Sequence, residues 1–362
     1  MSSSSSTNMM NVLPDDILKH ILSLLSTRDA FRTKFVCKSW VPLSELLDVL
    51  ILLSRHIQHI PLKTLYLFCH YKVRRPCFRL NQCVEAAKRR GIEDLSINWP
   101  RGVSSPSIFY CKTLVVLRLQ SITILSMVGF SIDLPLLKTL VLCNIMFSTL
   151  GDFMKLVYGC PKLEDLSTIY VMGKSGGSIK STTYFEPSSN LIKATTSIVE
   201  FPRYYWHFPT LSELGRSLPN KQIKGFRLFE NLIELRMYWY YRDTCDWSEI
   251  VKMLFICPKL KVLYIVKVMI KHNLTKTTKH DWKYPDHVPE SVRSHLTTCS
   301  IINYEAAEAD FRFAIYILKN ARLVQDMTIH VHSSSNTMQR AQFVENLSSF
   351  PRTSPACKLL LK

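Results

Sequence analysis

Histidines and other metal-ligating or nucleophilic side chains decide whether a chain could do catalytic or metal chemistry. Eleven histidines are scattered through the 362 residues, and only the pairs His56/His59 and His330/His332 are spaced to share one face of an element. Neither pair has a third ligand type nearby, so the spacing indicates no metal site. The sequence also lacks a glycine-rich phosphate loop, a G-x-S-x-G elbow and an H-E-x-x-H helix. We therefore expect no catalytic residue, no metal and no cofactor.

The eleven cysteines are odd in number, and no two of them have C-x-x-C spacing. Most lie inside apolar stretches, as Cys37, Cys143, Cys160 and Cys257 do. A thiol in such surroundings behaves as a small hydrophobic side chain. We expect reduced, buried thiols rather than disulfides or a zinc site.

The formal net charge is +18, and half of the excess falls in one segment. Residues 51–120 hold twelve basic and three acidic side chains, whereas residues 11–50 hold five of each. A basic surface favours acidic partners, nucleic acid or phosphates. Part of this excess has a local explanation, because Lys88-Arg89-Arg90 before Gly91 is typical of the last turn of a helix with a glycine cap. A solvated face is the simpler interpretation of the rest.

No stretch of the sequence is long and apolar enough to span a bilayer. The longest apolar runs, Leu46–Leu53 and Val262–Ile270, are short and are interrupted by Asp48 and Lys267. The first residues form a serine run without an apolar stretch behind it, which predicts a disordered tail over residues 1–10 and no signal peptide. We expect a soluble intracellular protein, in the nucleus, the cytoplasm or both.

Residues 11–50 carry the pattern of two or three short amphipathic helices. Pro14 suits a first helical position, and Asp15 and Asp16 complement the helix dipole in the first turn. The first helix has apolar residues at helical spacing, namely Ile17, Leu18, Ile21, Leu22 and Leu25. Thr27 can cap a second helix that ends near Trp40. Helices this short cannot bury their apolar faces on one another, so they need a partner.

This pattern resembles the F-box, a module that docks on a small SKP-family adaptor and thereby joins a cullin-RING ubiquitin ligase. The matching stretches are Leu13-Pro14-Asp15-Asp16-Ile17-Leu18 and Val36-Cys37-Lys38-Ser39-Trp40. The resemblance implies an adaptor-binding face that consists of Leu13, Pro14, Ile17, Leu18, Ile21, Leu25, Val36, Cys37 and Trp40. Such a face would pack its helices into an apolar groove of the adaptor.

Residues 60–270 repeat the pattern L-x-x-L-x-L. The units begin at Leu62, Ile92, Leu114, Leu137, Leu163, Leu232 and Leu260. The separations of 22 to 30 residues are typical of leucine-rich repeats, and the one gap of 69 residues would hold one or two degenerate repeats around Leu191-Ile192. Each unit should supply a short strand of a parallel sheet with one continuous core, which predicts burial of Leu65, Leu95, Leu117, Leu140 and Leu263. Isolated strands in an unrelated α/β domain are the alternative.

The segments between these strands are predicted to be helical, and two of them should end before a Cys-Pro pair. Asp246-Trp-Ser-Glu249 has the form of a capping box for a helix that stops before Cys257-Pro258, and Gly151–Gly159 stops before Cys160-Pro161. In the strand at Tyr238-Trp239-Tyr240-Tyr241, alternate aromatics must face opposite sides, so about half should be exposed. These four residues are our candidates for contacting a target, and an aromatic core is the alternative.

Residues 280–362 have a different pattern, beginning with Trp282-x-x-Pro285-x-x-Val288-Pro289. Strands are predicted at Thr298–Ile302 and Asp326–His332, and helices at Glu305–Asn320 and Gln339–Ser348. The first helix would bury Phe311, Ala314, Ile315 and Leu318. With the closing Pro351-Arg352-Thr353-Ser354-Pro355, this segment resembles the FBD domain at the C-terminus of many plant F-box proteins.

The order of the three parts resembles the plant F-box/FBD/leucine-rich-repeat family over practically the whole chain. The resemblance implies an α/β protein, with a helical F-box, a solenoid of parallel strands with return helices, and a small C-terminal α/β unit. It also implies a non-catalytic substrate-recognition subunit of an SCF-type ubiquitin ligase. Its partners would be the SKP-family adaptor, through it the cullin and RING subunits, and a target protein. The alternative, which the net charge favours, is a repeat protein that binds nucleic acid or an anionic ligand, including a small molecule or inositol phosphate seated in the solenoid.

Overall fold

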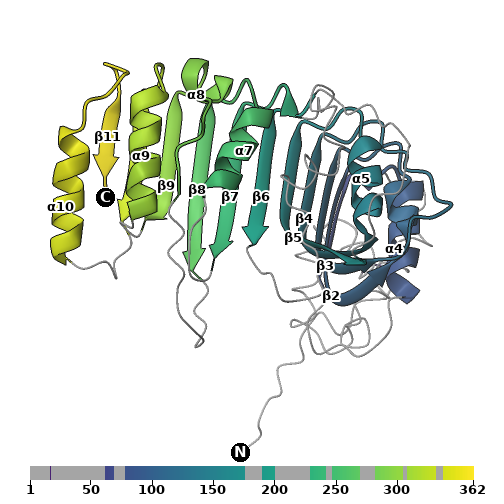
Figure 1. The fold of residues 1–362 in the computed structure, drawn as a ribbon. Helices are drawn as coiled ribbons and strands as arrows, with labels where there is room; N and C mark the ends of the chain where they lie inside the picture. Colours follow the sequence, from purple (N-terminus) through teal and green to yellow (C-terminus); the bar gives the residue numbers. More distant parts are fainter. Residues whose placement is uncertain are drawn as a thin grey trace, which may run out of the picture. The chain divides into compact units, whose positions relative to one another are not determined.

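The computed structural model describes residue 17 and residues 62–68, 78–175, 190–199, 229–241, 247–269, 282–304, 308–331 and 337–362 (Figure 1). The chain divides into two compact units, Met1–Leu137 and Lys138–Lys362. Of the residues described, no helix has both the length and the apolar character that crossing a membrane requires.

In the first unit three parallel strands follow one another in sequence order. They are β1 (Thr64–Phe68), β2 (Asp94–Ser104) and β3 (Val116–Ile124), joined by the helix α4 (Phe78–Arg89) and the short 3₁₀ helix η5 (Pro106–Phe109). The predicted glycine cap of α4 is confirmed, because Gly91 has a left-handed φ of 72°. Its N–H donates to the carbonyl of Lys88, and the Ile92 N–H donates to that of Ala87, as in a Schellman motif.

The second unit continues the same alternation through eight described strands, each hydrogen-bonded in parallel to the next. The strands are β4 (Thr139–Thr149), β5 (Asp165–Ser175), β6 (Lys193–Val199), β7 (Glu234–Tyr241), β8 (Val262–Met269), β9 (Thr298–Tyr304), β10 (Asp326–Val331) and β11 (Lys358–Leu361). The helices between them are α5 (Leu150–Tyr158), α7 (Ser248–Ile256), α8 (Glu290–Ser294), α9 (Glu308–Asn320) and α10 (Thr337–Ser349). Figure 1 shows α7 and α9 over one face of these strands.

The predicted repeat register is confirmed by burial. Each of the five leucines named above is at most 1% exposed. The degenerate repeat is present as β6 and the residues before it: Leu191 is buried two residues before the strand, and Ala194 is buried in β6 at the second position of the pattern. At the third position of the pattern, Thr168 and Thr196 are both buried, and their hydroxyl oxygens lie 3.3 Å apart in a hydrogen bond. A shared hydrogen bond thus replaces an apolar contact without leaving a polar group unpaired.

The two predicted return helices end before Cys-Pro, as expected, but begin differently. In α5 the Thr149 hydroxyl accepts from the Asp152 N–H and the Asp152 carboxylate accepts from the Thr149 N–H, each at 3.1 Å, which is a capping box. The capping box predicted for Asp246–Glu249 is wrong, since α7 has Trp247 as its N-cap and no side-chain cap. The indole of Trp247 is fully buried and hydrogen-bonded elsewhere, so tertiary packing fixes where α7 begins.

Several strands share a kink at one position of the repeat. The residues there have a left-handed φ of 52° to 59° and are Ser121, Asn144, Tyr170 and Asn303. Each lies two residues after the third position of the L-x-x-L-x-L pattern. In β3 and β4 two consecutive side chains therefore lie outside the core, and burial resumes at Ile122 and Ile145. Asparagine, present at two of these four positions, tolerates this conformation better than most side chains do.

The C-terminal segment is an α/β unit, as the sequence predicts, and it is joined to the repeats by backbone hydrogen bonds. Strand β9 pairs in parallel with β8, so the ladder of the repeats runs on into the segment that resembles FBD. The closing motif caps α9 at its C-terminal end: the Thr353 N–H donates to the carbonyl of Leu318 and the Thr353 hydroxyl to that of Lys319. Helix ends leave such carbonyls unpaired, so the motif satisfies two of them.

A buried ion pair connects the last repeat with α9. The Nζ atom of Lys267 lies 2.5 Å from Oδ2 of Asp310, and both side chains are 0% exposed. The Trp247 indole donates to Oδ1 of the same carboxylate at 3.0 Å. Trp247 also stacks on Phe313, with ring centroids 3.8 Å apart, so the ion pair is enclosed by aromatic rings.

The buried carboxylate also explains why the predicted face of α9 is correct for only two of its four residues. The sequence predicted burial of Phe311 and Ile315, which are only half-buried, together with Ala314 and Leu318, which are buried. Because Asp310 points inward to Lys267, the buried face instead includes Phe313 and Ile317 at the helical spacing from Asp310.

We predict that Leu117→Ala lowers the free energy of unfolding by about 2–5 kcal/mol, because it leaves a cavity in a completely buried site. Gln120 is exposed on the same strand, so Gln120→Ala should change stability by no more than about 0.5 kcal/mol. Urea unfolding followed by circular dichroism compares the two. Equal midpoints for both variants would contradict the repeat register.

We predict that Lys267→Met and Asp310→Asn each cost about 3–5 kcal/mol, because either change leaves the partner charge buried without its counterpart. The double variant removes both charges and keeps an oxygen to accept from Trp247. It should therefore be more stable than the sum of the two single losses implies. A double-mutant cycle of urea midpoints measures this coupling, and strict additivity would show that the two charges do not interact.

Candidate functional site

The candidate site for a target is the face of the second unit's sheet opposite its buried leucines, which we call the outer face. On strands β5 to β8 its side chains are Asp165, Ser167, Lys193, Thr195, Glu234, Arg236, Val262 and Tyr264. Each side chain lies beside its equivalent on the next strand, because the strands pair in register. The outer face therefore carries rows of polar and apolar side chains, while the opposite face of the same strands carries the buried leucines.

Ion pairs organise the charges in the middle of the outer face. The Glu234 carboxylate accepts from Nε of Arg236 at 2.8 Å and lies 3.3 Å from Nζ of Lys193. Burial opposes ionisation of this carboxyl, but the hydrogen bonds from Arg236 and Lys193 outweigh it, and the pKa of Glu234 lies below its usual value. The Arg236 guanidinium also lies over the ring of Tyr264, 4.6 Å from its centroid. The cations here are fixed in place by their neighbours.

The four aromatic residues that the sequence proposed for target contact divide between the two faces of β7. Tyr238 and Tyr240 are half-buried on the outer face, and the Tyr240 ring lies 4.8 Å from that of Tyr170. Trp239 is 0% exposed and packs edge-on against Trp247, so the prediction that it contacts a target is wrong. It belongs to the aromatic core that surrounds Asp310. The side chain of Tyr241 lies outside the described residues.

Of the predicted adaptor-binding residues, the structure describes only Ile17. It is helical, as the sequence predicts, and its side chain is 47% exposed. The remaining members of the set lie outside the described residues: Leu13, Pro14, Leu18, Ile21, Leu25, Val36, Cys37 and Trp40.

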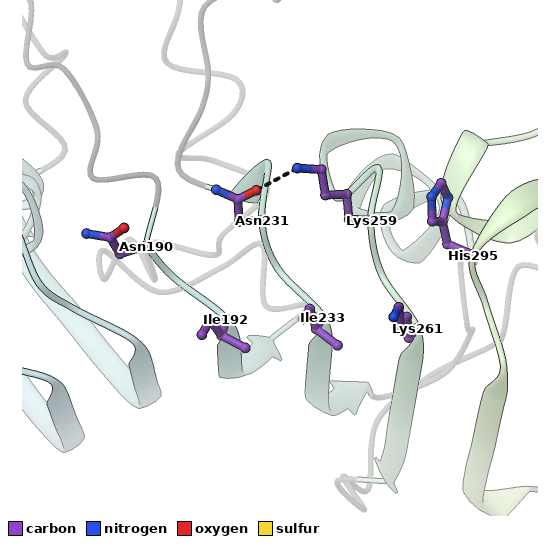
Figure 2. Close-up of a pocket in the computed structure, with 7 residues that line it drawn as sticks. All are labelled: Asn190, Ile192, Asn231, Ile233, Lys259, Lys261 and His295. Carbon is purple, nitrogen blue, oxygen red and sulfur yellow. Dashed lines mark hydrogen bonds between the residues drawn. The ribbon is translucent and has the colours of Figure 1, made fainter.

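A pocket of about 440 Å³ lies at the edge of the second unit's sheet, where the chain enters strands β6 to β9 (Figure 2). We call it the edge pocket, and it is lined by Asn190, Ile192, Asn231, Ile233, Lys259, Lys261 and His295. Nζ of Lys259 donates to Oδ1 of Asn231 at 2.7 Å. This pocket was not predicted from the sequence, although the tripeptide Asn-Leu-Ile occurs at both 190–192 and 231–233 and could have indicated equivalent positions.

The described part of the chain shows no metal-ligating cluster, and burial makes three of its cysteine thiols unreactive. Among the described residues no three metal-ligating side chains cluster, and His330 is half-buried on β10 while His332, like His56 and His59, lies outside the described part. Burial raises the pKa of the Cys160 and Cys299 thiols to about 12, and it also raises that of Cys143. Because the thiolate is the nucleophile, these thiols are inert at neutral pH.

Comparison with protein families gives three matches, in the order that the sequence analysis expects. An F-box domain matches residues 10–48, and the FBD matches residues 284–329. The leucine-rich repeats of FBD-associated F-box protein At5g56370 match residues 80–185.

Near full-length similarity to curated Arabidopsis thaliana proteins accompanies these matches. FBD-associated F-box protein At4g10400 is 27% identical, over 96% of this chain and 98% of the relative. F-box/FBD/LRR-repeat protein At5g56420 is 24% identical, over 97% and 98%. FBD-associated F-box protein At5g56370 is also 24% identical, over 97% and 99%. With its F-box, its parallel ladder of repeats and its C-terminal FBD, the chain belongs to the plant F-box/FBD/leucine-rich-repeat family.

Proposed function

We propose that the protein is the substrate-recognition subunit of an SCF-type ubiquitin ligase. F-box proteins generally act in such ligases, and an F-box domain in general binds an SKP-type adaptor. The observation that carries the proposal is the F-box match at residues 10–48 on the same chain as a parallel repeat ladder with an organised outer face. In this proposal one end of the chain binds the adaptor and the repeats and FBD bind a target.

The adaptor would be bound by the apolar residues of the F-box that the sequence analysis names. An amphipathic helix of this kind recognises a groove through side chains at helical spacing. Cullin and RING subunits would join through the adaptor, and the thioester chemistry would belong to them and to the conjugating enzyme. This chain would contribute proximity, holding lysines of the target where the conjugating enzyme reaches them. We place this assembly in the nucleus, the cytoplasm or both.

Ion pairing on the sheet favours a protein target over a nucleic acid. A phosphate backbone is bound by cations that exchange their counterions for phosphates. Several cations on the described strands already have carboxylate partners, since Arg236 and Lys193 have Glu234 and Arg118 has Asp94 at 2.8 Å. A face with both signs of charge and neighbouring tyrosines is better suited to a protein surface.

We predict that the intact chain captures a plant SKP-family adaptor in a co-purification experiment. A Leu13→Ala, Pro14→Ala variant should reduce the captured adaptor by about tenfold or more, because central apolar anchors dominate such interfaces. The matched control is Leu323→Ala, Pro351→Ala, which removes the same two residue types from exposed positions of the C-terminal part.

The control variant should capture as much adaptor as the intact chain. If the intact, folded chain captures none, or if both variants capture it equally well, the F-box residues do not bind the adaptor and the proposal is wrong.

A further inference from the structure

The edge pocket is basic and lacks acidic groups. Two lysines and a histidine line it, together with two asparagine amides and two isoleucines, and none of the seven residues is acidic. The isoleucines are unusually accessible for β-branched apolar side chains, with Ile192 45% and Ile233 37% exposed. The pocket therefore combines an apolar floor with cationic and amide groups, as ligand sites commonly do.

The residue that follows the first leucine of each L-x-x-L-x-L unit occupies the same place in every repeat, and we call this series of residues the row. Comparison of ion pairs along the row shows that the pocket lacks a carboxylate. In an earlier repeat the row pairs Lys138 with Glu164 at 2.8 Å, so the cation is neutralised. Lys261 instead follows Ile233 in the row, and no ion pair joins it to a carboxylate within the described part of the chain. A carboxylate of a bound ligand could therefore pair with Lys261, as Glu164 pairs with Lys138.

The floor of the pocket is rigid and of defined length. Along it, the Ile233 N–H donates to the Ile192 carbonyl at 2.8 Å, and the Lys261 N–H donates to the Ile233 carbonyl at 2.9 Å. Neighbouring strands lie about 4.8 Å apart, so the four strand entries span about 14 Å. An extended peptide advances about 3.3 Å per residue, so about four residues would cross the pocket.

We infer that the edge pocket binds an extended acidic peptide segment of the target. Its carboxylates pair with Lys259 and Lys261, and an aliphatic side chain lies on Ile192 and Ile233 (Figure 2). The Asn190 amide donates to the carbonyl of Pro161 at 2.9 Å, and its oxygen is suited to accept from the peptide's backbone. The role as a target site rests on the proposed function, but the binding itself does not.

Peptide recognition fits the pocket better than nucleic-acid recognition does. Proteins that bind single-stranded nucleic acid stack its bases on aromatic side chains, and the seven lining residues include no phenylalanine, tyrosine or tryptophan. The two exposed isoleucines offer instead a surface for an aliphatic side chain.

The test is fluorescence polarisation with the purified full chain and two labelled peptides. One carries a leucine with glutamates two and four residues after it, so that these side chains share one face of an extended chain, and the other has glutamine in place of each glutamate. The glutamate peptide should bind, and the glutamine peptide should bind about two- to thirtyfold more weakly, since two exposed ion pairs are lost. Lys259→Gln, Lys261→Gln should weaken binding of the glutamate peptide by a similar factor. The matched control is Lys138→Gln, Lys358→Gln, which removes the same charge from exposed positions outside the pocket and should bind normally.

Adaptor capture and circular dichroism on the same preparations separate the outcomes. No peptide binding by a folded chain that captures the adaptor would overturn this inference and leave the proposed function standing. Peptide binding without adaptor capture would support the pocket and count against the ligase role. Equal weakening by both lysine variants, or displacement of the peptide by an equal concentration of oligothymidylate, would show attraction by net charge alone and overturn the inference.

Discussion

The ion pair between Lys267 and Asp310 is the constraint on which the second unit depends. Removing two charges from water costs several kcal/mol for each ion, and only close pairing offsets this cost. The pair joins β8 to α9, and the Trp247 indole adds the start of α7 to the same carboxylate. The last repeat and the FBD helix must therefore be assembled together. The FBD in this sense continues the solenoid, and it contributes the carboxylate of Asp310 to the ion pair that connects the two.

In the repeats next to this ion pair, one set of side chains stabilises the fold and another set is available for binding. Leucines and their substitutes fill equivalent core positions on strand after strand, so the backbone positions of the ladder vary little. The side chains between them are free to differ, and they give an ion-paired outer face at Glu234 and an unneutralised basic pocket at Lys261. One architecture thus presents two chemically different surfaces, one on the strands and one where the chain enters them.

Features that recur in every repeat could be predicted from the sequence, whereas the ion pair and the edge pocket, which each occur once, could not. Leucines at fixed spacing predicted the strands and their buried faces, because a period is visible in one chain. The same spacing continues in the FBD as Leu296-x-x-Cys299-x-Ile301, where a cysteine in place of leucine concealed it, although all three residues are buried. Lys267 was interpreted as the interruption of an apolar run, yet it follows Leu263 and Ile265 in the inward alternation. Its partner is 43 residues away, a separation that no local pattern encodes. The edge pocket was missed for the same reason, because its residues come from four loops that only the ladder brings together.

The left-handed residues at one height of the ladder have a consequence for how such chains tolerate changes in length. In a strictly alternating strand such as β7, one inserted residue reverses every later side chain, exchanging core for solvent. In β3 and β4 the chain already contains one residue more than strict alternation allows, at Ser121 and Asn144, and the later apolar side chains still reach the core. The kink therefore divides these strands into two segments whose parity is set independently. Deletion of Ser121 or Asn144 would therefore restore strict alternation and keep the later apolar side chains in the core, whereas a deletion within β7 would exchange core for solvent from that point on.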